Sequence, residues 1–243
     1  MKEYTKEELL RLKHNDHKQA ILNYMKGTRH IRDKQNFLFK WVKPTSDETI
    51  LECGSSSGKT CIDFTKRIGC TMIGIDFSKE AIKISTEMQR IYFPALKENC
   101  IFQENDLTKM VFDKTISKIL MPDFSEHIPD NVFSDILNNI KKQLPSVKLY
   151  VYTPVRTHIF EILKHNNILM KNPEGHINVK TEKELRLFLQ KMGWKIIEHK
   201  WIPSHLPIIR NFESLLGHIP VIGKYFHRKV AILAIPFKKS DKF

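Results

Sequence analysis

Short apolar runs alternate with amphipathic segments between residues 49 and 153. Several of the runs are rich in Ile, Leu and Val, as expected for strands buried on both faces of a parallel sheet. They lie at 49–53, 71–76, 100–104, 116–121 and 148–153. Apolar residues at helical spacing predict helices between them, at about 59–68, 79–92 and 130–143. The alternation predicts right-handed βαβ units in an α/β fold: a doubly wound, mostly parallel sheet with helices on both faces.

The two ends of the chain depart from this alternation. Apolar residues at helical intervals predict helices over residues 3–43, which would form an N-terminal helical cap of residues 1–45. Residues 46–243 would then form one α/β domain. We expect its last part to bring the sheet to seven strands with elements near 181–192 (a helix), 194–199 and 230–236 (strands).

Composition and charge limit the kinds of partner, metal site and location that the chain can have. The 243 residues suffice for a buried core without disulfides, and Lys and Arg outnumber Asp and Glu by 40 to 27, a net charge of +13. Such a charge raises the case for a nucleic-acid or anionic-membrane partner, but the bases are scattered along the chain, as on an ordinary lysine-rich surface. The four cysteines have no zinc-ligand spacing, so we expect reduced thiols and no metal site. The polar N-terminus and the lack of a long apolar stretch favour a cytoplasmic protein.

The loop after the first strand has three competing interpretations. The sequence there reads Glu52-Cys-Gly54-Ser-Ser56-Ser-Gly58-Lys-Thr. A phosphate-binding P-loop requires one more residue between the two glycines, and the GxGxxG pattern of dinucleotide-binding folds is absent. The third pattern, acidic-x-Gly-x-Gly-x-Gly, is met by Glu52, Gly54 and Gly58, with Ser56 in place of the middle glycine.

Polar residues also follow the next three strands. Asp76 ends the second strand, where a carboxylate can accept hydrogen bonds from both ribose hydroxyls of a nucleoside. Asn105-Asp106-Leu107 follows the third strand, and Met121-Pro-Asp123-Phe-Ser-Glu-His127-Ile follows the fourth. The carboxyl ends of parallel strands share one edge of the sheet, so these groups are expected at one ligand site.

Residues 49–128 resemble the Rossmann-like class I S-adenosylmethionine-dependent methyltransferases, and are most similar to the small-molecule and quinone-biosynthesis branch. The resemblance implies that the glycine loop approaches the methionine part of the cofactor, that Asp76 holds the ribose, and that Phe77 and the Asp106-Leu107 pair contact the adenine. It implies a product, S-adenosylhomocysteine, and these cofactor-binding residues: Glu52, Gly54, Ser56, Gly58, Asp76, Phe77, Asp106, Leu107 and Asp123.

Several residues have a structural alternative. Asp76 could serve as a helix N-cap, Glu52 could be a surface acid that caps the following helix, and Asn105-Asp106 could form a plain turn. His127 and His176 are the candidate catalytic bases, but either histidine could instead orient a loop. Ser56 departs from the family pattern, because its Cβ lies where the backbone should come closest to the ligand. At the N-terminus, a group of bases and aromatics forms either a lid over the cofactor or the exposed face of a docking helix: Tyr24, Arg29, His30 and Arg32.

Together these patterns predict a methyltransferase that acts on a small-molecule or lipid/glycan-linked acceptor, at oxygen. One alternative is an RNA-directed methyltransferase, supported by the net charge; Met121-Pro122-Asp123 is not the Asn-Pro-Pro-Tyr signature of amino-directed nucleic-acid enzymes. A second alternative is a SAM-binding protein without catalysis. Residues 202–228 read as an acceptor-side insertion that meets a membrane surface peripherally. The competing interpretation is that Leu206, Ile208, Phe212, Leu215 and Ile219 cover the sheet as ordinary core.

Overall fold

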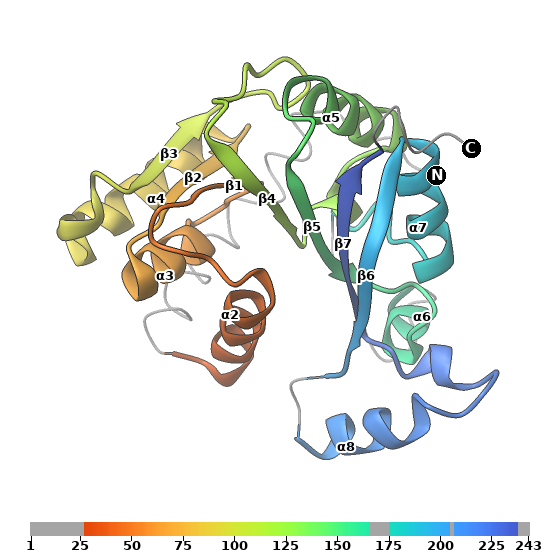
Figure 1. Cartoon of the computed structure of the whole chain (residues 1–243). Coiled ribbons are helices and arrows are strands. Elements are labelled where there is room, and N and C mark those ends of the chain that lie inside the picture. Colours follow the sequence, from red (N-terminus) through yellow and green to blue (C-terminus); the bar gives the residue numbers. More distant parts are fainter. Residues whose placement is uncertain (1–26, 166–174, 205–206, 238–243) are drawn as a thin grey trace. The chain divides into compact units, whose positions relative to one another are not determined.

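A seven-stranded sheet runs through the protein (Figure 1), whose computed structural model describes residues 27–165, 175–204 and 207–237. The strand order is β3-β2-β1-β4-β5-β7-β6. β1 pairs in parallel with β2 and β4, β2 pairs in parallel with β3, and β7 is antiparallel to both β5 and β6. The strands are β1 (Thr49–Cys53), β2 (Thr71–Asp76), β3 (Cys100–Glu104), β4 (Ile116–Pro122), β5 (Lys148–Pro154), β6 (Trp194–Ile202) and β7 (Lys229–Pro236). This confirms the doubly wound, mostly parallel Rossmann-like fold.

Helices connect the strands at the positions that the apolar spacing predicts. They are α2 (Arg29–Val42), α3 (Lys59–Ile68), α4 (Lys79–Tyr92), α5 (Asp130–Gln143), α6 (Ile159–His165), α7 (Glu182–Lys191) and α8 (Pro207–Leu216), with 3-10 turns η1 (Pro94–Leu96), η2 (Ser125–His127) and η3 (Gly223–Tyr225). α6 and α8 were not predicted. Of the expected cap, α2 is helical, whereas residues 1–26, including Tyr24, and Leu206 lie outside the described residues.

The described residues form two compact units. The first contains residues 27–121 and 139–147, with β1, β2, β3 and most of β4. α3 contacts β2, and α4 contacts β2 and β3. A lysine inside β4 is buried here: the Lys118 ammonium donates to the Lys43 carbonyl at 3.0 Å and to the Glu48 carboxylate at 2.6 Å. All four cysteines are free and buried, as expected for reduced thiols.

The second unit contains residues 122–138 and 148–237, with the antiparallel strands β5, β7 and β6. Thr181 and Glu184 form a capping box that starts α7: the Thr181 hydroxyl accepts from the Glu184 N–H, and the Glu184 carboxylate accepts from the Thr181 N–H. The buried Leu185 and Leu189 of α7 face the core, and the Phe188 ring stacks on Phe133 at 5.2 Å.

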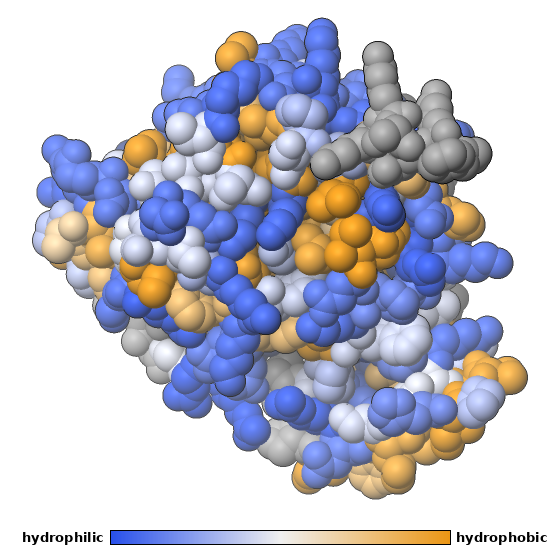
Figure 2. Space-filling model, in the orientation of Figure 1, coloured by the Kyte–Doolittle hydropathy of each residue, from blue (hydrophilic) through white to orange (hydrophobic). Residues whose placement is uncertain are grey.

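The insertion between β6 and β7 contains α8, in which Glu213 is buried and Ile209 and Leu216 are half-buried. The buried Glu213 carboxylate accepts from the Ser204 N–H and lies 2.9 Å from Nε2 of the fully buried His158. By contrast, Ile208, Phe212 and Leu215 are 74%, 60% and 70% exposed, and hydrophobic side chains gather over this segment in Figure 2. The interpretation of these three residues as core is therefore wrong. Among the described helices, none is long and apolar enough to cross a membrane.

Candidate cofactor and acceptor sites

The loop after β1 alternates left-handed residues with others. Gly54, Ser56 and Gly58 have φ angles of 69°, 52° and 73°. The Ser55 N–H donates to the Ile75 carbonyl at 2.9 Å, and the Gly58 N–H donates to the Ser55 carbonyl at 2.8 Å. These bonds fold the loop back onto the end of β2 and start α3 at Lys59.

Two glycines allow this close packing. A Cβ at Gly58, or at Gly74 of β2, would overlap the Phe102 ring of β3. Gly74 pairs with Glu52, so the first acidic residue of the motif lies beside this contact. The glycine at position 58 is therefore required for packing and for its positive φ, whatever it contributes to a ligand.

Asp76 joins the glycine loop to the end of β2. It is 2% exposed; its Oδ2 accepts from the Ser56 N–H and its Oδ1 from the Ser78 N–H, both at 3.0 Å. The N-cap of α4 is Ser78, whose hydroxyl accepts from the Ala81 N–H at 3.2 Å. The interpretation of Asp76 as the helix N-cap is therefore wrong. Asp76 instead orders the loop and the start of the helix together.

Glu52 is a buried carboxylate near the N-terminus of α3. Burial raises its pKa, and the Cys61 thiol, 3.0 Å away, donates to Oε2. A carboxylate with this environment is stabilised by a nearby cation. The ammonium group of an amino-acid ligand fits that requirement.

The residues after β3 lie next to Asp76 along the sheet edge. The Asn105 N–H donates to the Asp76 carbonyl at 3.1 Å. Asp106 is exposed, and its carboxylate accepts from the backbone and hydroxyl of Thr108. Leu107 is buried, and its carbonyl accepts from the Asn139 side chain at 3.0 Å. Of the predicted cofactor residues, all except Asp123 thus lie in the first unit: Glu52, Gly54, Ser56, Gly58, Asp76, Phe77, Asp106 and Leu107.

This unit contains further buried polar groups that the sequence motif did not identify as part of a site. The Gln35 side chain of α2 donates to the Thr60 hydroxyl at 3.4 Å. Its Oε1 and the hydroxyl oxygens of Ser55 and Ser57 are buried and have no hydrogen-bond partner among the described residues. Buried polar atoms without partners are uncommon and indicate a missing ligand or water. The glycine motif does not point to Gln35, because Gln35 lies on α2, which precedes the motif in the sequence.

In the second unit, the residues after β4 form another polar cluster. Asp123 has a φ of 53°, its N–H donates to the Tyr152 carbonyl at 2.7 Å, and its carboxylate pairs with Lys229. Glu126 is 1% exposed and accepts from the Thr153 hydroxyl at 2.9 Å. Burial and the Asp123 carboxylate raise the pKa of Glu126 to about 7.

The two candidate histidines lie together in this cluster. Nδ1 of His127 lies 2.9 Å from the Gly175 carbonyl, and the His127 and His176 rings are 5.0 Å apart at 78°. The loop that carries His176 is held by Asn178, whose N–H donates to the Glu126 carbonyl at 3.0 Å. The motif after β4 and the later Gly-His sequence therefore meet in space, and Glu126 is the third member of the group.

A comparison with known families identifies the class of protein. The family model described as "Methyltransferase domain" matches residues 22–199, well over half of the chain. This chain belongs to the class I S-adenosylmethionine-dependent methyltransferases. Its cofactor is S-adenosylmethionine. No curated protein sequence matches the methyltransferase.

Solved structures of the same fold are distant in sequence. The YcgJ protein from Bacillus subtilis has a TM-score of 0.61 at 13% identity, over 85% of this methyltransferase and 99% of that chain. Geranyl diphosphate C-methyltransferase from Streptomyces coelicolor A3(2) gives 0.61 at 13%, over 84% and 79%. Magnesium protoporphyrin IX methyltransferase from Synechocystis PCC 6803 gives 0.59 at 14%, over 86% and 83%. At these identities the likeness shows the fold alone.

Proposed function

We propose that this methyltransferase transfers the methyl group of S-adenosylmethionine to an oxygen of a small-molecule or lipid/glycan-linked acceptor. The observation that carries the proposal is the cluster of Glu126 and His127, which follow β4 in place of an Asn-Pro-Pro-Tyr motif, with His176. Amide side chains suit the recognition of an amino group, whereas histidines can contact a hydroxyl and accept its proton. Solved relatives act on small molecules by their names, geranyl diphosphate and magnesium protoporphyrin IX among them.

On the cofactor side, the proposal assigns the predicted residues by their geometry. Asp76 would accept from the ribose hydroxyls, with Phe77, Asp106 and Leu107 around the adenine. Gly54, Ser56 and Gly58 would follow the methionine part, and Glu52 would stabilise its ammonium. For Asp123 the support is weakest, because its carboxylate already pairs with Lys229.

On the acceptor side, the residues chiefly position the nucleophile. The bound cofactor supplies a methyl group on a sulfonium. Transfer to the acceptor oxygen would form the C–O bond and break the C–S bond, whose electron pair would stay on sulfur, with S-adenosylhomocysteine as the product. Such an in-line displacement depends on the alignment of the acceptor oxygen. We assign that alignment, and removal of the hydroxyl proton, to His127 and His176.

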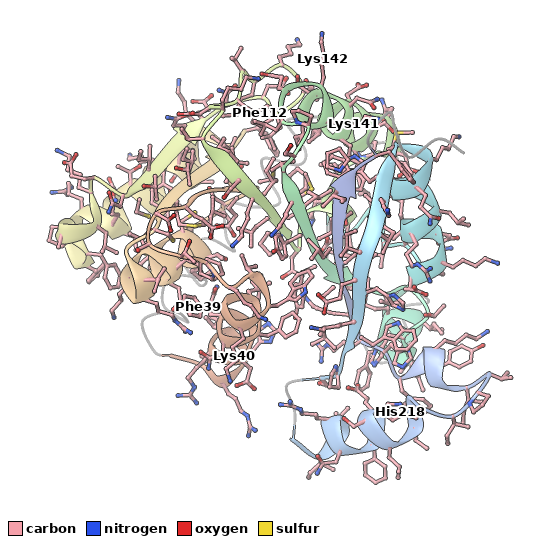
Figure 3. The ribbon with its side chains drawn as sticks, in the orientation of Figure 1. Phe39, Lys40, Phe112, Lys141, Lys142 and His218 are labelled. Atoms are coloured by element: carbon pink, nitrogen blue, oxygen red, sulfur yellow. The ribbon has the colours of Figure 1, made fainter. Side chains whose placement is uncertain are left out.

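Incubation with methyl-labelled cofactor and fractionated cell extract tests this proposal. Label is expected in small-molecule, lipid or glycan fractions, on oxygen. Label in RNA would support the nucleic-acid alternative, which also predicts RNA binding with a steep salt dependence. The three lysines labelled in Figure 3 do not form one stripe, since Lys40 lies on α2 and Lys141 and Lys142 lie on α5. Cofactor binding without label in any fraction would support the non-catalytic alternative.

We also propose that the acceptor-side insertion of residues 202–228 meets an anionic membrane surface. The exposed residues Ile208, Phe212 and Leu215 follow helical spacing along one side of α8. Past the helix, Ile219 and Val221 are 42% and 82% exposed. Apolar side chains enter the headgroup boundary, while bases beside them meet anionic lipid. Arg210 and Lys224 are the exposed bases of this segment, and the protein carries a net charge of +13.

Flotation with anionic vesicles at low salt tests the membrane proposal. The wild-type protein is expected to float, and Ile208→Ser with Leu215→Ser to remain at the bottom. Val111→Ser is the matched control, because Val111 is 83% exposed but lies outside the insertion. Failure of the wild type to float, or an equal effect of the control, would refute membrane contact through this segment.

A further inference from the structure

Three side chains in the second unit come together with the composition of a metal site. Glu126, His127 and His176 each offer one ligand atom, and these atoms all lie within 4.8 Å of one another. Glu126 and His127 lie on the turn after β4, whereas His176 comes from the loop before α7. The sequence did not predict this site. Metal motifs are recognised by pairs of ligands at short spacings, whereas His176 is far from Glu126 and His127 in the sequence.

Hydrogen bonds hold the two segments together. The Asn178 N–H donates to the Glu126 carbonyl at 3.0 Å, and its side-chain amide donates to the Ile128 carbonyl at 2.8 Å. Lys180, on the same loop, pairs with Asp130 at 2.5 Å. The position of His176 beside the turn therefore follows from several backbone and side-chain contacts and does not depend on the histidine itself.

His127 is oriented as metal-binding histidines are. A carbonyl oxygen only accepts, so the 2.9 Å contact with Gly175 places the proton on Nδ1. The neutral ring then presents the lone pair of Nε2. A backbone carbonyl that fixes the tautomer in this way is a common partner of a metal ligand.

Glu126 supplies the second, independent observation. The side chain is almost fully buried, and the Thr153 hydroxyl donates to Oε2 at 2.9 Å. The other oxygen, Oε1, is buried and has no hydrogen-bond partner within the described part of the chain. A buried carboxylate oxygen is stable when a cation or donor completes its environment.

We propose that Glu126, His127 and His176 bind one divalent transition-type cation. Two imidazoles and one carboxylate suit Zn²⁺, Mn²⁺, Fe²⁺ or Co²⁺ and leave positions open for other oxygens. The chemical role rests on the proposed function: the ion would bind the acceptor hydroxyl, whose proton leaves to solvent, and hold the resulting oxyanion for methylation. With the ion bound, both rings are ligands, and activation of the hydroxyl passes from the rings to the ion.

Titration of the chelator-treated, untagged full chain with Co²⁺ tests this site, with visible absorption as the readout. The wild type is expected to bind one equivalent with a d–d band that saturates at micromolar Co²⁺. His127→Ala and His176→Ala should each weaken binding at least about 10-fold, the range known for changes around a metal site. His218→Ala is the control, since His218 is exposed and lies just after α8 (Figure 3).

The outcomes separate the metal site from the proposed function. Absence of a band in the folded wild type, or a band that survives in both variants, overturns the site. If His127→Ala does not fold, His176→Ala and Glu126→Gln answer the same question. A site that binds Co²⁺ while no oxygen acceptor is methylated overturns the proposed function and leaves the site standing. Methylation at full rate after complete removal of metal overturns the role of the ion.

Discussion

Replacement of Ser56 by glycine tests how the cofactor loop is built. Ser56 has a φ of 52°, in the left-handed region that glycine adopts without steric conflict. Its contact with Asp76 is made by the backbone N–H, at 3.0 Å, so Ser56→Gly keeps that hydrogen bond. The change therefore removes the Cβ and the hydroxyl without removing the main-chain contact.

The expected effect on stability is the difference between two terms. A non-glycine residue in the left-handed region costs about 1–2 kcal/mol. Glycine loses more backbone entropy on folding, which costs about 0.5–1 kcal/mol. Ser56→Gly should therefore stabilise the protein by about 0.5–1 kcal/mol. In a chain of this length that corresponds to a rise in Tm of about 1–4 °C.

Thermal unfolding and isothermal titration with S-adenosylhomocysteine measure the two consequences. Ser56→Gly should raise Tm and bind the ligand as tightly as the wild type or more tightly. Lys43→Gly is the matched control for strain, because the exposed Lys43 has a φ of 49° and lies outside the loop. A higher Tm for Lys43→Gly with a lower one for Ser56→Gly would refute the strain argument. Loss of binding in both Ser56→Gly and Ser56→Ala would mean that the hydroxyl contacts the ligand.

Three further changes test other parts of the structure. Asp76→Ala should abolish most of the Tm shift caused by S-adenosylhomocysteine, since each hydrogen bond to a charged acceptor contributes about 1.5–3 kcal/mol; a folded variant with the wild-type shift would contradict the assignment. Burial alone would raise the pKa of Glu48, but Lys118 and hydrogen bonds from Thr45 together more than offset this, and the pKa lies below its ordinary value of 4.5. The pair therefore stabilises the protein above that pH and is lost on acidification, so the Tm difference between wild type and Glu48→Gln should shrink from pH 6 to pH 3.5. Glu213→Ala leaves His158 buried without its partner, and should cost about 3–5 kcal/mol and speed proteolysis within residues 207–227, unlike Glu213→Gln.

The strands and the cofactor loop could be predicted because both depend on neighbouring residues. Strand ends at Cys53 and Asp76 follow from apolar runs that stop at small or polar residues. Two of the three left-handed residues of the loop are glycines, the residue type that adopts this conformation most readily. Ser56 is the exception, and its φ could be inferred only from its place in the pattern.

The orientation of α8 could not be predicted, because periodicity identifies the faces of a helix without saying which is buried. Its apolar stripe of Ile208, Phe212 and Leu215 suggested a core face. The deciding contact is the pairing of Glu213 with His158, which precedes α6 and is far away in sequence. Because Glu213 and His158 satisfy each other, the helix side that carries Glu213 is the buried one, and the apolar stripe stays exposed.

The residues proposed for the cofactor and those proposed for the acceptor also differ in how far the sequence predicts their positions. Residues that would hold the cofactor lie on consecutive strand ends, where backbone geometry places them. The residues proposed for the acceptor come from separate segments: several contacts, those of Asn178 among them, hold the His176 loop beside the turn after β4. A change of acceptor therefore requires changes in loops and in the insertion, while the cofactor loop stays as it is. Variants at Asn178 should accordingly alter metal binding and acceptor methylation together and leave S-adenosylhomocysteine binding intact. Equal loss of cofactor binding in Asn178→Ala would show that the two sets of residues are not separate.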